Sequence, residues 1–545
     1  MAELIEQYNS RATNFPGLMA IGLALCMILS ASVTSASEQK NGAEPTVSIA
    51  QGMLTGVNND HIDSFKGIPY AAAPIGDLRW RPPQLPQTWS GIRDANRFGH
   101  DCTQMPVSWD DTPPTTQPSE DCLYLNVWRP HTAARLPVLV WIHGGGFVNG
   151  ASSAALYDGA HFAKDGIIFV SINYRLGRFG FFAHPALMAE HPNEPKGNYG
   201  YMDQIAALRW VHDNIAAFGG NPDQVTIMGE SAGGASVLML LNAPGARGLF
   251  ARAIAQSGGG SDFSLNERIS EVAAGKAAAE EVGIAFAKSV GIEGRGAQAL
   301  RALRKLNAMK VAGDLNMETM FTGKEFTTYT DPMIDGKIVT SSLLDIYAKR
   351  LQARLPLLIG ATGADISFFS ARSKDDAFSA FGPAQAAARK AYDVDGSVPL
   401  EQLIAKIGAD RYMVEPARHA ARAFAATGVA VYEYRFTYVP PGLKATSPNG
   451  AGHFSDVPFV FETQNLFKGG QTSPGDAAVA AQIHAYWVNF TKSGDPNGPG
   501  LVQWPRYSAD RDELLEIGEN GPKAMADPWK ERLDAVMVSN GSNEL

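Results

Sequence analysis

The chain has 545 residues, of which 45% are hydrophobic and 19% charged, a balance typical of a globular protein with a large core. Its formal net charge of −9 at pH 7 argues against a nucleic-acid partner, because phosphates require a basic face. The 55 glycines and 33 prolines are typical of a loop-rich α/β protein rather than a helical bundle.

The first 37 residues have the layout of a secretory signal peptide. An apolar run over residues 17–31 follows Arg11 and precedes small polar residues that end near Ala36 or Ser37. This order directs export, and the run is shorter than the ~20 residues that cross a bilayer. We expect a secreted or periplasmic protein that loses residues 1–37 and then keeps no stable membrane association; an uncleaved anchor is the alternative.

Strand and helix patterns alternate along the rest of the chain. Apolar runs predict buried strands over residues 138–142, 167–172, 225–228, 355–362 and 429–438. Between the second and third runs, apolar positions recur at helical spacing from Ile205 to Phe218, and Gly219 and Gly220 follow where a helix should end. The alternation favours an α/β fold with a mostly parallel sheet covered on both faces.

The remaining segments complete this expected domain. Residues 43–89 are rich in turns and short strands, which predicts an antiparallel entry to the sheet. Helical insertions are expected at about residues 266–313 and 374–425, where they cap one end of the sheet. No linker stands out, so we expect a single domain over residues 38–545.

Ser231 lies at G-x-S-x-G spacing in the stretch TIMGESAGGA, residues 226–235. A predicted strand precedes it and an apolar helical segment follows it, so the serine occupies a strand-to-helix corner. Such an elbow exposes a nucleophilic hydroxyl and requires small neighbours, which explains Gly229, Gly233 and Gly234. The alternative for the motif alone is a glycine-rich packing turn.

The stretch HGGGF, residues 143–147, directly follows the strand predicted at residues 138–142. Acyl transfer requires backbone N–H groups aimed at the oxyanion, and successive glycines let the main chain approach the substrate closely. Gly145 and Gly146 supply two such groups in this interpretation, and Ala232 supplies a third. A glycine triplet alone is a weak signal, but one paired with a downstream elbow is strong.

Further motifs extend over almost the whole chain after the leader. They are FKGIPYAAAPIGDLRWRPP (65–83), SEDCLYLNVW (119–128), NYRLGRFGFF (173–182), GNYGYMDQIAALRWVHDNIAAFGGNP (197–222), AIAQSG (253–258), SGDPN (493–497) and WPRY (504–507). Together with WIHGGGF and GESAGG, they make the chain resemble the type B carboxylesterases, the family that includes the cholinesterases. The resemblance implies an α/β-hydrolase fold with a large, mostly parallel central sheet, helices on both faces and helical insertions over the active site.

The same resemblance implies the nucleophile and oxyanion roles given above, and a disulfide between Cys102 and Cys122. From the residues alone, two cysteines in an exported chain are a candidate pair, with two unpaired buried thiols as the alternative. Nothing near them has the histidine spacing of a metal site. Neither a metal nor an organic cofactor is expected, because the chemistry requires none and no phosphate-cradling loop follows a strand.

His453 is the predicted catalytic histidine among the three that follow the elbow. His419 and His484 lie inside helical patterns, whereas His453 lies in the loop NGAGHFSDVPFVF, which lets an imidazole reach over the end of the sheet. His453 also aligns with the catalytic-histidine block of the resembled family.

Asp365 is the predicted acid, at a position where this chain departs from the family pattern. The stretch IGATGADISFF, residues 359–369, aligns with a family block that usually carries glutamate. Either carboxylate can orient an imidazole, but aspartate is one methylene shorter, so either its backbone must approach the histidine more closely or the pair is looser. Asp456, three residues after His453, is the alternative acid.

Other polar residues near these motifs receive different interpretations. The resemblance implies that Glu230 lies buried near the site and influences its charge, whereas the residues alone allow an ordinary core acid satisfied by hydrogen bonds. Ser257, polar beside apolar strand residues, is interpreted as a packing residue.

These features together predict a serine carboxylesterase that hydrolyses small-molecule esters through an acyl-enzyme. The same chemistry on a lactone, amide or acyl-transfer substrate is the alternative. An inactive binding protein of this fold is disfavoured because nucleophile, histidine and glycine donors are all present. Members of the resembled family act on short acyl, aromatic and choline esters and on bulky natural products such as fumonisin-type mycotoxins, so the resemblance selects neither one ester nor an oligomeric state.

Overall fold

The computed structural model describes residues 44–259, 268–272, 275, 277–320, 322, 327–467 and 472–540. The predicted signal peptide, residues 1–37, lies outside these residues, as does the domain boundary predicted at residue 38. Within the described ranges, every helix is too short or too polar to cross a bilayer.

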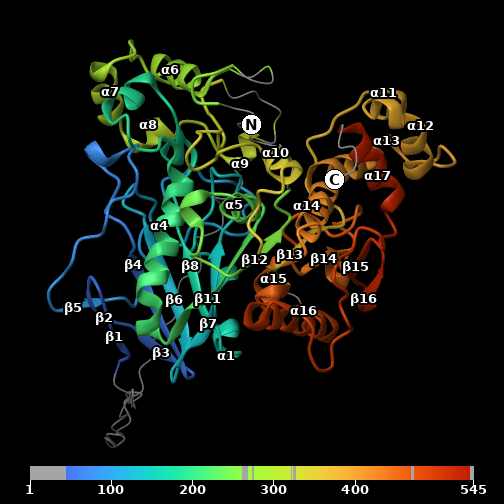
Figure 1. The fold of residues 1–545 in the computed structure, drawn as a ribbon, viewed down its shortest axis with the longest axis horizontal. Helices are drawn as coiled ribbons and strands as arrows, with labels where there is room; N and C mark the ends of the chain where they lie inside the picture. Colours follow the sequence, from blue (N-terminus) through green and yellow to red (C-terminus); the bar gives the residue numbers. More distant parts are fainter. Residues whose placement is uncertain are drawn as a thin grey trace, which may run out of the picture. The chain divides into compact units, whose positions relative to one another are not determined.

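An eleven-stranded sheet lies at the centre of the fold, in the order β16-β15-β14-β13-β12-β11-β7-β8-β6-β4-β3 (Figure 1). In chain order its strands are β3 (Val57–Asn59), β4 (Ile62–Pro69), β6 (Tyr124–Pro130), β7 (Leu136–Ile142), β8 (Ile168–Ile172), β11 (Gly220–Glu230), β12 (Arg252–Gln256), β13 (Leu357–Thr362), β14 (Val431–Phe436), β15 (Glu513–Gly518) and β16 (Gly521–Ala526). All pairs from β15 to β8 are parallel, and the pairs beyond them at both edges are antiparallel. The mostly parallel sheet predicted from the sequence is confirmed.

The α-helices connect and cover these strands. They are α1 (Ala160–Lys164), α2 (Gly177–Gly180), α3 (Pro185–Glu190), α4 (Tyr199–Asn214), α5 (Ala232–Leu240), α6 (Ala279–Ser289), α7 (Ala297–Arg304), α8 (Ala308–Ala312), α9 (Met317–Met320), α10 (Leu343–Ala348), α11 (Lys374–Ser379), α12 (Gln385–Tyr392), α13 (Leu400–Ala409), α14 (Glu415–Ala425), α15 (Val457–Val460), α16 (Pro474–Ser493) and α17 (Lys530–Ser539). The insertions predicted at about residues 266–313 and 374–425 contain α6 to α8 and α11 to α14; α6 to α8 gather at the top of Figure 1 and α11 to α13 at its upper right.

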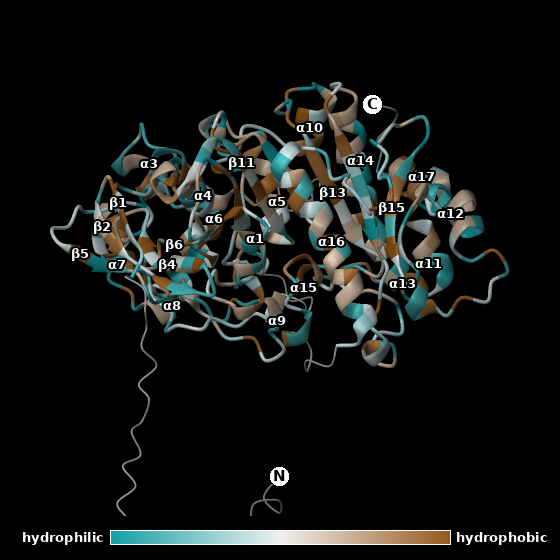
Figure 2. Cartoon of the chain, turned by 90° about the horizontal axis from the view of Figure 1, so that it is seen from below, coloured by the Kyte–Doolittle hydropathy of each residue, from teal (hydrophilic) through white to brown (hydrophobic). Residues whose placement is uncertain are grey.

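Alternate side chains of the central strands enter two separate cores, as the period of two in a strand requires. Val138, Val140 and Ile142 of β7 pack in one core with residues of α4, α5 and α14. Leu139 and Trp141 of the same strand pack in the other core with residues of α1, α15 and α16. In Figure 2, brown is frequent on β11 and β13, whereas teal is more frequent on α11 and α12. The sheet is therefore buried on both faces.

The N-terminal segment only partly follows the prediction of an antiparallel entry to the sheet. β3 and β4 do join its edge as an antiparallel pair. The strands β1 (Thr46–Ile49) and β2 (Gly52–Thr55), however, form a separate sheet with β5 (Ile92–Asp94). Gly56 separates the two sheets, and a Cβ there would lie 2.4 Å from the carbonyl oxygen of Ser64. The chain crosses from one sheet to the other at this close contact, which apolar patterning does not reveal.

A disulfide joins Cys102 and Cys122, whose Cα atoms are 5.0 Å apart. Both residues are buried. Within the loop that the disulfide closes, the Gln104 side-chain amide donates to the Gly150 carbonyl at 2.8 Å, and its oxygen accepts from Gly150 N at 2.9 Å. The disulfide loop is thereby attached to the segment that follows the HGGGF stretch.

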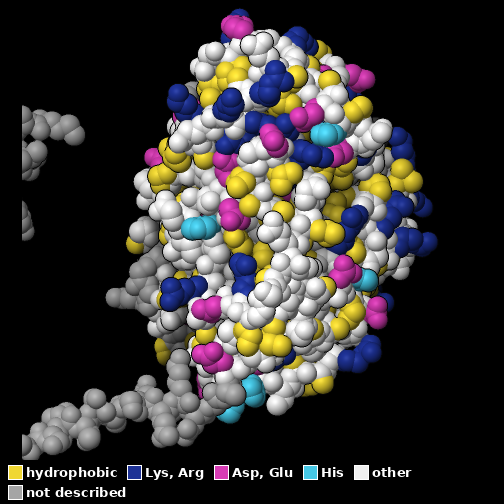
Figure 3. Space-filling view, turned by 90° about the vertical axis from the view of Figure 1, so that its left-hand side faces the viewer, with side chains coloured by type: hydrophobic (Ala, Val, Ile, Leu, Met, Phe, Trp, Pro, Cys, Tyr) yellow, Lys and Arg dark blue, Asp and Glu magenta, His cyan; other side chains and the backbone are white. Residues whose placement is uncertain are grey.

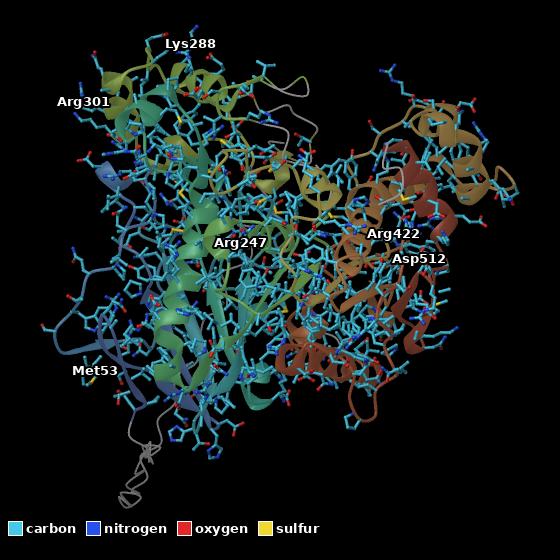
Figure 4. All side chains as sticks on the ribbon, in the orientation of Figure 1. Met53, Arg247, Lys288, Arg301, Arg422 and Asp512 are labelled. Atoms are coloured by element: carbon cyan, nitrogen blue, oxygen red, sulfur yellow. A yellow bond between two sulfur atoms is a disulfide. The ribbon has the colours of Figure 1, made fainter. Side chains whose placement is uncertain are left out.

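Charged side chains of both signs are mixed on one face of the molecule, and a buried ion pair joins two elements in the interior. On the face drawn in Figure 3, basic and acidic side chains are interspersed. In the interior, Arg418 of α14 pairs with Asp512, which is labelled in Figure 4 and precedes β15. Each side chain is at most 3% exposed, so this ion pair anchors α14 to the β15 edge of the sheet.

Candidate active site

Ser231 stands between the end of β11 and the start of α5. Its φ of 56° and ψ of −125° lie in a region that residues with a Cβ rarely adopt. The backbone is held on both sides, because Ser231 N donates to the Gln256 carbonyl at 2.9 Å and Ala235 N donates to the Ser231 carbonyl at 2.8 Å. The predicted strained elbow is present, and its serine is only partly buried.

The glycines around Ser231 allow three chain segments to approach one another. A Cβ on Gly233 would lie 2.0 Å from the Ile142 carbonyl oxygen at the end of β7. A Cβ on Gly229 would lie 2.4 Å from the backbone of Gly233, and one on Gly234 2.6 Å from the Gln256 carbonyl oxygen. Real Cβ atoms do not approach backbone so closely, so the elbow requires glycine at all three positions.

The HGGGF stretch leaves β7 and packs onto the elbow. A Cβ on Gly144 would lie 3.0 Å from the Cβ of Ser231. Gly145 and Gly146 have φ values of 104° and 59°, which favour glycine. In the described part of the chain, the backbone N–H groups of Gly145, Gly146 and Ala232 donate to no protein acceptor. Three N–H groups beside the serine are therefore available to a ligand.

His143 supports this glycine turn from within the protein. Its Nδ1 donates to the Gly144 carbonyl at 2.8 Å, and its ring stacks on Tyr174 with centroids 4.5 Å apart. The Tyr174 hydroxyl in turn donates to the His143 carbonyl at 2.9 Å. Burial lowers the pKa of His143 to about 4 despite the bond to Gly144, so its imidazole is neutral at pH 7 and fixes the turn without adding charge.

His453 and Asp365 form a chain of hydrogen bonds with Ser231. His453 Nε2 lies 2.8 Å from Ser231 Oγ, and His453 Nδ1 lies 2.5 Å from Asp365 Oδ1. The histidine side chain is 17% exposed and the aspartate side chain is fully buried. With Asp365 ionised, Nδ1 donates to the carboxylate and Nε2 is left to accept the serine proton. The structure thus brings together the three residues predicted from distant parts of the sequence.

Asp365 lies in the loop that begins after β13, and its carboxylate is surrounded by hydrogen-bond donors. Oδ1 also accepts from Ile366 N at 2.7 Å. Oδ2 accepts from Ser257 Oγ at 2.7 Å and from the backbone N and Oγ1 of Thr362 at 3.0 and 2.8 Å. Burial by itself raises the pKa of Asp365, but His453 and these donors outweigh it and hold the pKa below its usual range. The carboxylate is therefore ionised at neutral pH.

The shorter aspartate is accommodated by a close approach of the two loops, which is the first of the two outcomes that the sequence left open. Ala364 N donates to the Ala451 carbonyl at 2.8 Å, and Ala364 pairs with Gly452 as an isolated bridge. The backbones are thus joined at the residues immediately before Asp365 and His453. This pairing brings the two loops close enough for the shorter Asp365 side chain to contact His453.

The sequence-based interpretation of Ser257 as a packing residue is wrong, because Ser257 contacts the site. Its hydroxyl donates to Asp365, and its φ of 43° is unusual for a residue with a Cβ. Thr362, which sequence analysis did not single out, contacts the same carboxylate oxygen. The available signal was topological, since polar residues at the carboxyl ends of neighbouring parallel strands meet at one sheet edge. β12 ends just before Ser257, and β13 ends at Thr362.

The alternative residues lie away from Ser231 or point elsewhere. Asp456 is buried, and its Oδ2 accepts from Gln256 Nε2 at 2.9 Å and from the Tyr434 hydroxyl at 2.7 Å. His419 lies buried on α14. His484 lies on α16, where its ring contacts a carbonyl of α15 and a carboxylate after α1. None of the three takes the place of His453 or Asp365.

Glu230 is a second carboxylate beside the histidine. Its Oε1 lies 3.2 Å from His453 Nε2, and its side chain is 2% exposed. Burial raises the pKa of Glu230 to about 8, although His453 opposes the shift. Burial lowers the pKa of His453, but Glu230 and Asp365 outweigh it and raise the value to about 9. The charge of each group therefore shifts the pKa of the other across this contact.

The described residues contain no cluster of three or more histidine, cysteine, aspartate or glutamate side chains that could hold a metal ion. The site is instead made of one hydroxyl, one imidazole, two carboxylates and backbone N–H groups. These are the groups that general acid–base and nucleophilic chemistry use.

The parallel sheet, the elbow serine after a central strand and the chain order of serine, acid and histidine define an α/β-hydrolase. A profile described as Carboxylesterase family matches residues 43–394 and 384–535. The chain belongs to this carboxylesterase family.

Curated relatives and a solved structure resemble the chain over most of its length. It is 31% identical over 518 residues to a fumonisin B1 esterase of Sphingopyxis macrogoltabida, covering 92% of this chain and 91% of the relative. It is 34% identical over 521 residues to a para-nitrobenzyl esterase of Bacillus subtilis, covering 91% and 99%. A solved PNB esterase structure superposes with a TM-score of 0.77 at 31% identity, covering 91% of this chain and 99% of that one. With relatives named as esterases, the chain is a carboxylic ester hydrolase.

Proposed function

We propose that the chain hydrolyses esters with Ser231 as nucleophile, His453 as general base and acid, and Asp365 as the group that orients the imidazole. The observation that carries the proposal is the hydrogen-bonded chain from Ser231 Oγ through His453 to Asp365, with contacts of 2.8 and 2.5 Å. Such contacts lie within the reach that proton transfer requires.

Acylation begins when His453 Nε2 accepts the Ser231 proton and Oγ attacks the ester carbonyl carbon. The carbonyl oxygen becomes an oxyanion that accepts from the N–H groups of Gly145, Gly146 and Ala232. The C–O bond to the alcohol then breaks, and His453 returns the proton to the departing oxygen. Asp365 stays ionised throughout and stabilises the imidazolium.

Deacylation repeats these steps with water. His453 accepts a proton from the water, whose oxygen attacks the acyl carbon, and the same three N–H groups bind the second oxyanion. The ester bond to Ser231 breaks, Oγ regains its proton from the imidazolium, and the carboxylic acid leaves. Each turnover consumes one water and restores the starting protonation of the site.

Glu230 adjusts the protonation of His453 in this scheme. Replacing Glu230 by glutamine removes the negative charge that favours the imidazolium, so the pKa of His453 falls. The neutral base then persists to lower pH, and the acid limb of the kcat/KM profile moves to lower pH by about one unit. The measurement is kcat/KM for p-nitrophenyl butyrate between pH 4 and 9.

Glu415→Gln is the matched control for this pH profile. Glu415 of α14 is also buried, and burial raises its pKa to about 7. Because Glu415 does not contact His453, its replacement should leave the acid limb in place. An unchanged limb in Glu230→Gln, or an equal shift in both variants, contradicts the assigned influence of Glu230.

The proposal also covers export and the extent of the mature chain. The disulfide between Cys102 and Cys122 is of a kind that persists in oxidising compartments, and the leader-like residues 1–37 direct export. Residues 38–545 then form one catalytic domain. N-terminal sequencing of exported protein should begin near Ser37 or Glu38; an intact Met1 on membrane-bound material contradicts this part.

An assay with matched esters and amides tests the reaction class. Purified protein should hydrolyse p-nitrophenyl butyrate and turn over the corresponding p-nitroanilide far more slowly, because the amide carbonyl is less electrophilic and its leaving group is poorer. Faster turnover of the anilide assigns an amidase instead.

A further inference from the structure

A groove of about 1040 Å³ lies between α10, α14, α17 and the loop before β15, residues 507–510 (Figure 1). None of the residues that line it belongs to the catalytic site described above. A concavity of this size accommodates a small molecule.

The helix α14 presents two different faces, because side chains three and four residues apart lie on the same side of a helix. Ala420 and Ala421 pack in the core on one face of the central sheet. His419, Arg422 and Ala426 follow one another at spacings of three and four residues and line the groove. The groove therefore opens on the outer face of α14.

His419 is a polar side chain in the wall of the groove that has no hydrogen-bond partner in the described part of the chain. The residue is only 6% exposed, yet neither ring nitrogen is fully enclosed by protein. Burial, with a smaller contribution from the charge of Arg422, lowers the pKa of His419 to about 4. The imidazole is therefore neutral at pH 7 and has one N–H to donate within the groove.

Arg422, labelled in Figure 4, forms no ion pair within the described ranges. Its Nη1 donates to Met537 Sδ at 3.1 Å, and a thioether is only a weak acceptor. Asp534 of α17 also lines the groove, but it is already paired with Arg418 at 2.8 Å and with Lys530 at 2.5 Å. The guanidinium of Arg422 is therefore available to an anionic ligand.

The rest of the groove combines an exposed rim with apolar walls. The acids Asp345 and Asp510 line it, but both are exposed, so water and salt screen their charges. The apolar lining residues include Leu344, Ala348, Ala425 and Val538. The deeper donors suit an anionic head group, and the apolar walls suit a hydrocarbon tail.

We propose that this groove binds a carboxylate that carries an apolar tail. The Arg422 guanidinium donates two N–H groups to the carboxylate, which replaces its weak contact with Met537. The His419 imidazole donates a further N–H, and the tail lies against the apolar walls. The acids that a carboxylic ester hydrolase releases belong to this chemical class, so the groove is a second place where a product of the reaction binds.

Calorimetric titration with octanoate tests the site, in protein whose Ser231 carries a phosphonyl group that fills the catalytic site. We expect one octanoate per chain with a Kd below about 1 mM. Arg422→Gln, which removes the charge, should raise the Kd at least about 10-fold. Arg247→Gln, at an exposed arginine outside the groove that is also labelled in Figure 4, should change it less than about twofold. Absence of saturable binding, or equal losses in both variants, overturns the proposal.

Ala426→Trp tests the groove without a change of charge. Ala426 is exposed and lies one turn after Arg422 on α14, and side chains on a helix lean toward its N-terminus, so an indole at residue 426 covers the guanidinium. The Kd for octanoate should rise at least about fivefold. Melting temperatures and kcat/KM for p-nitrophenyl butyrate should match the original protein in both groove variants. An unchanged Kd in Ala426→Trp places octanoate elsewhere and overturns the proposal.

Three other probes identify the chemistry that the groove selects. Octanol, which lacks the charge, and acetate, which lacks the tail, should each bind at least about 10-fold more weakly than octanoate. Equal affinity for octanol overturns the carboxylate assignment, and equal affinity for acetate overturns the assignment of the tail. Tighter binding of octyltrimethylammonium also overturns the proposal, because Asp345 and Asp510 would then define the site. Failure of the proposed catalytic function looks different, since the dependence of octanoate binding on Arg422 is measurable in unlabelled protein as well.

Discussion

Ser231→Ala is expected to lower kcat for p-nitrophenyl acetate and butyrate by about 10⁶-fold, since loss of a nucleophile serine removes the covalent route entirely. The fold should persist, because alanine keeps the Cβ at the elbow and removes only the hydroxyl that contacts His453. Steady-state hydrolysis assays and a melting curve measure the two effects.

Ser289→Ala is the control for this loss. Ser289 ends α6 and donates to the Phe286 carbonyl, far along the chain from the elbow, so full turnover is expected. Retained turnover in Ser231→Ala, or equal losses in both variants, is incompatible with a serine nucleophile at residue 231.

Asp365→Asn is expected to lower kcat by about 10⁴-fold, as the equivalent change does in the Ser–His–Asp template. The amide can donate to His453 Nδ1, which selects the wrong tautomer and leaves Nε2 protonated. The donors Ser257 and Thr362 lose their ionised acceptor as well. Substrate binding should change little, so the loss should fall in kcat rather than in KM.

Asp456→Asn is the matched control for the acid. Asp456 is buried like Asp365, but its hydrogen bonds go to Gln256 and Tyr434. We expect a loss of less than about 10-fold, arising from weaker support of the neighbouring loop. If Asp456→Asn is the more damaging change, the acid has been assigned to the wrong residue.

Periodicity and glycine patterns were enough to predict the central sheet and the elbow. β7 and β11 are apolar because both of their faces are buried, so their apolar runs are readable without knowledge of their neighbours. The glycines after Ser231 and in the HGGGF stretch are required by close backbone contacts. Apolar runs and glycines are therefore readable from the sequence, because burial of a strand and close backbone contact restrict the residue at each position directly.

The contacts among distant segments could not be predicted in the same way. Asp365 and Asp456 were both candidates because the sequence does not state which carboxylate faces His453. Asp456 is turned away by hydrogen bonds to residues 22 and 200 positions distant. Ser257 was misinterpreted for the same reason, since its partner Asp365 lies 108 residues away, in the loop that follows the next strand.

Covalent labelling measures the proposed nucleophile most directly. Incubation with a p-nitrophenyl phosphonate ester should release one p-nitrophenol per chain and leave one phosphonyl group, which mass spectrometry of peptides should locate on Ser231. His453→Ala, which cannot remove the serine proton, should remain unlabelled over the same period. A phosphonyl group on any other residue, or ester turnover by fully active protein that never becomes labelled, would contradict the account.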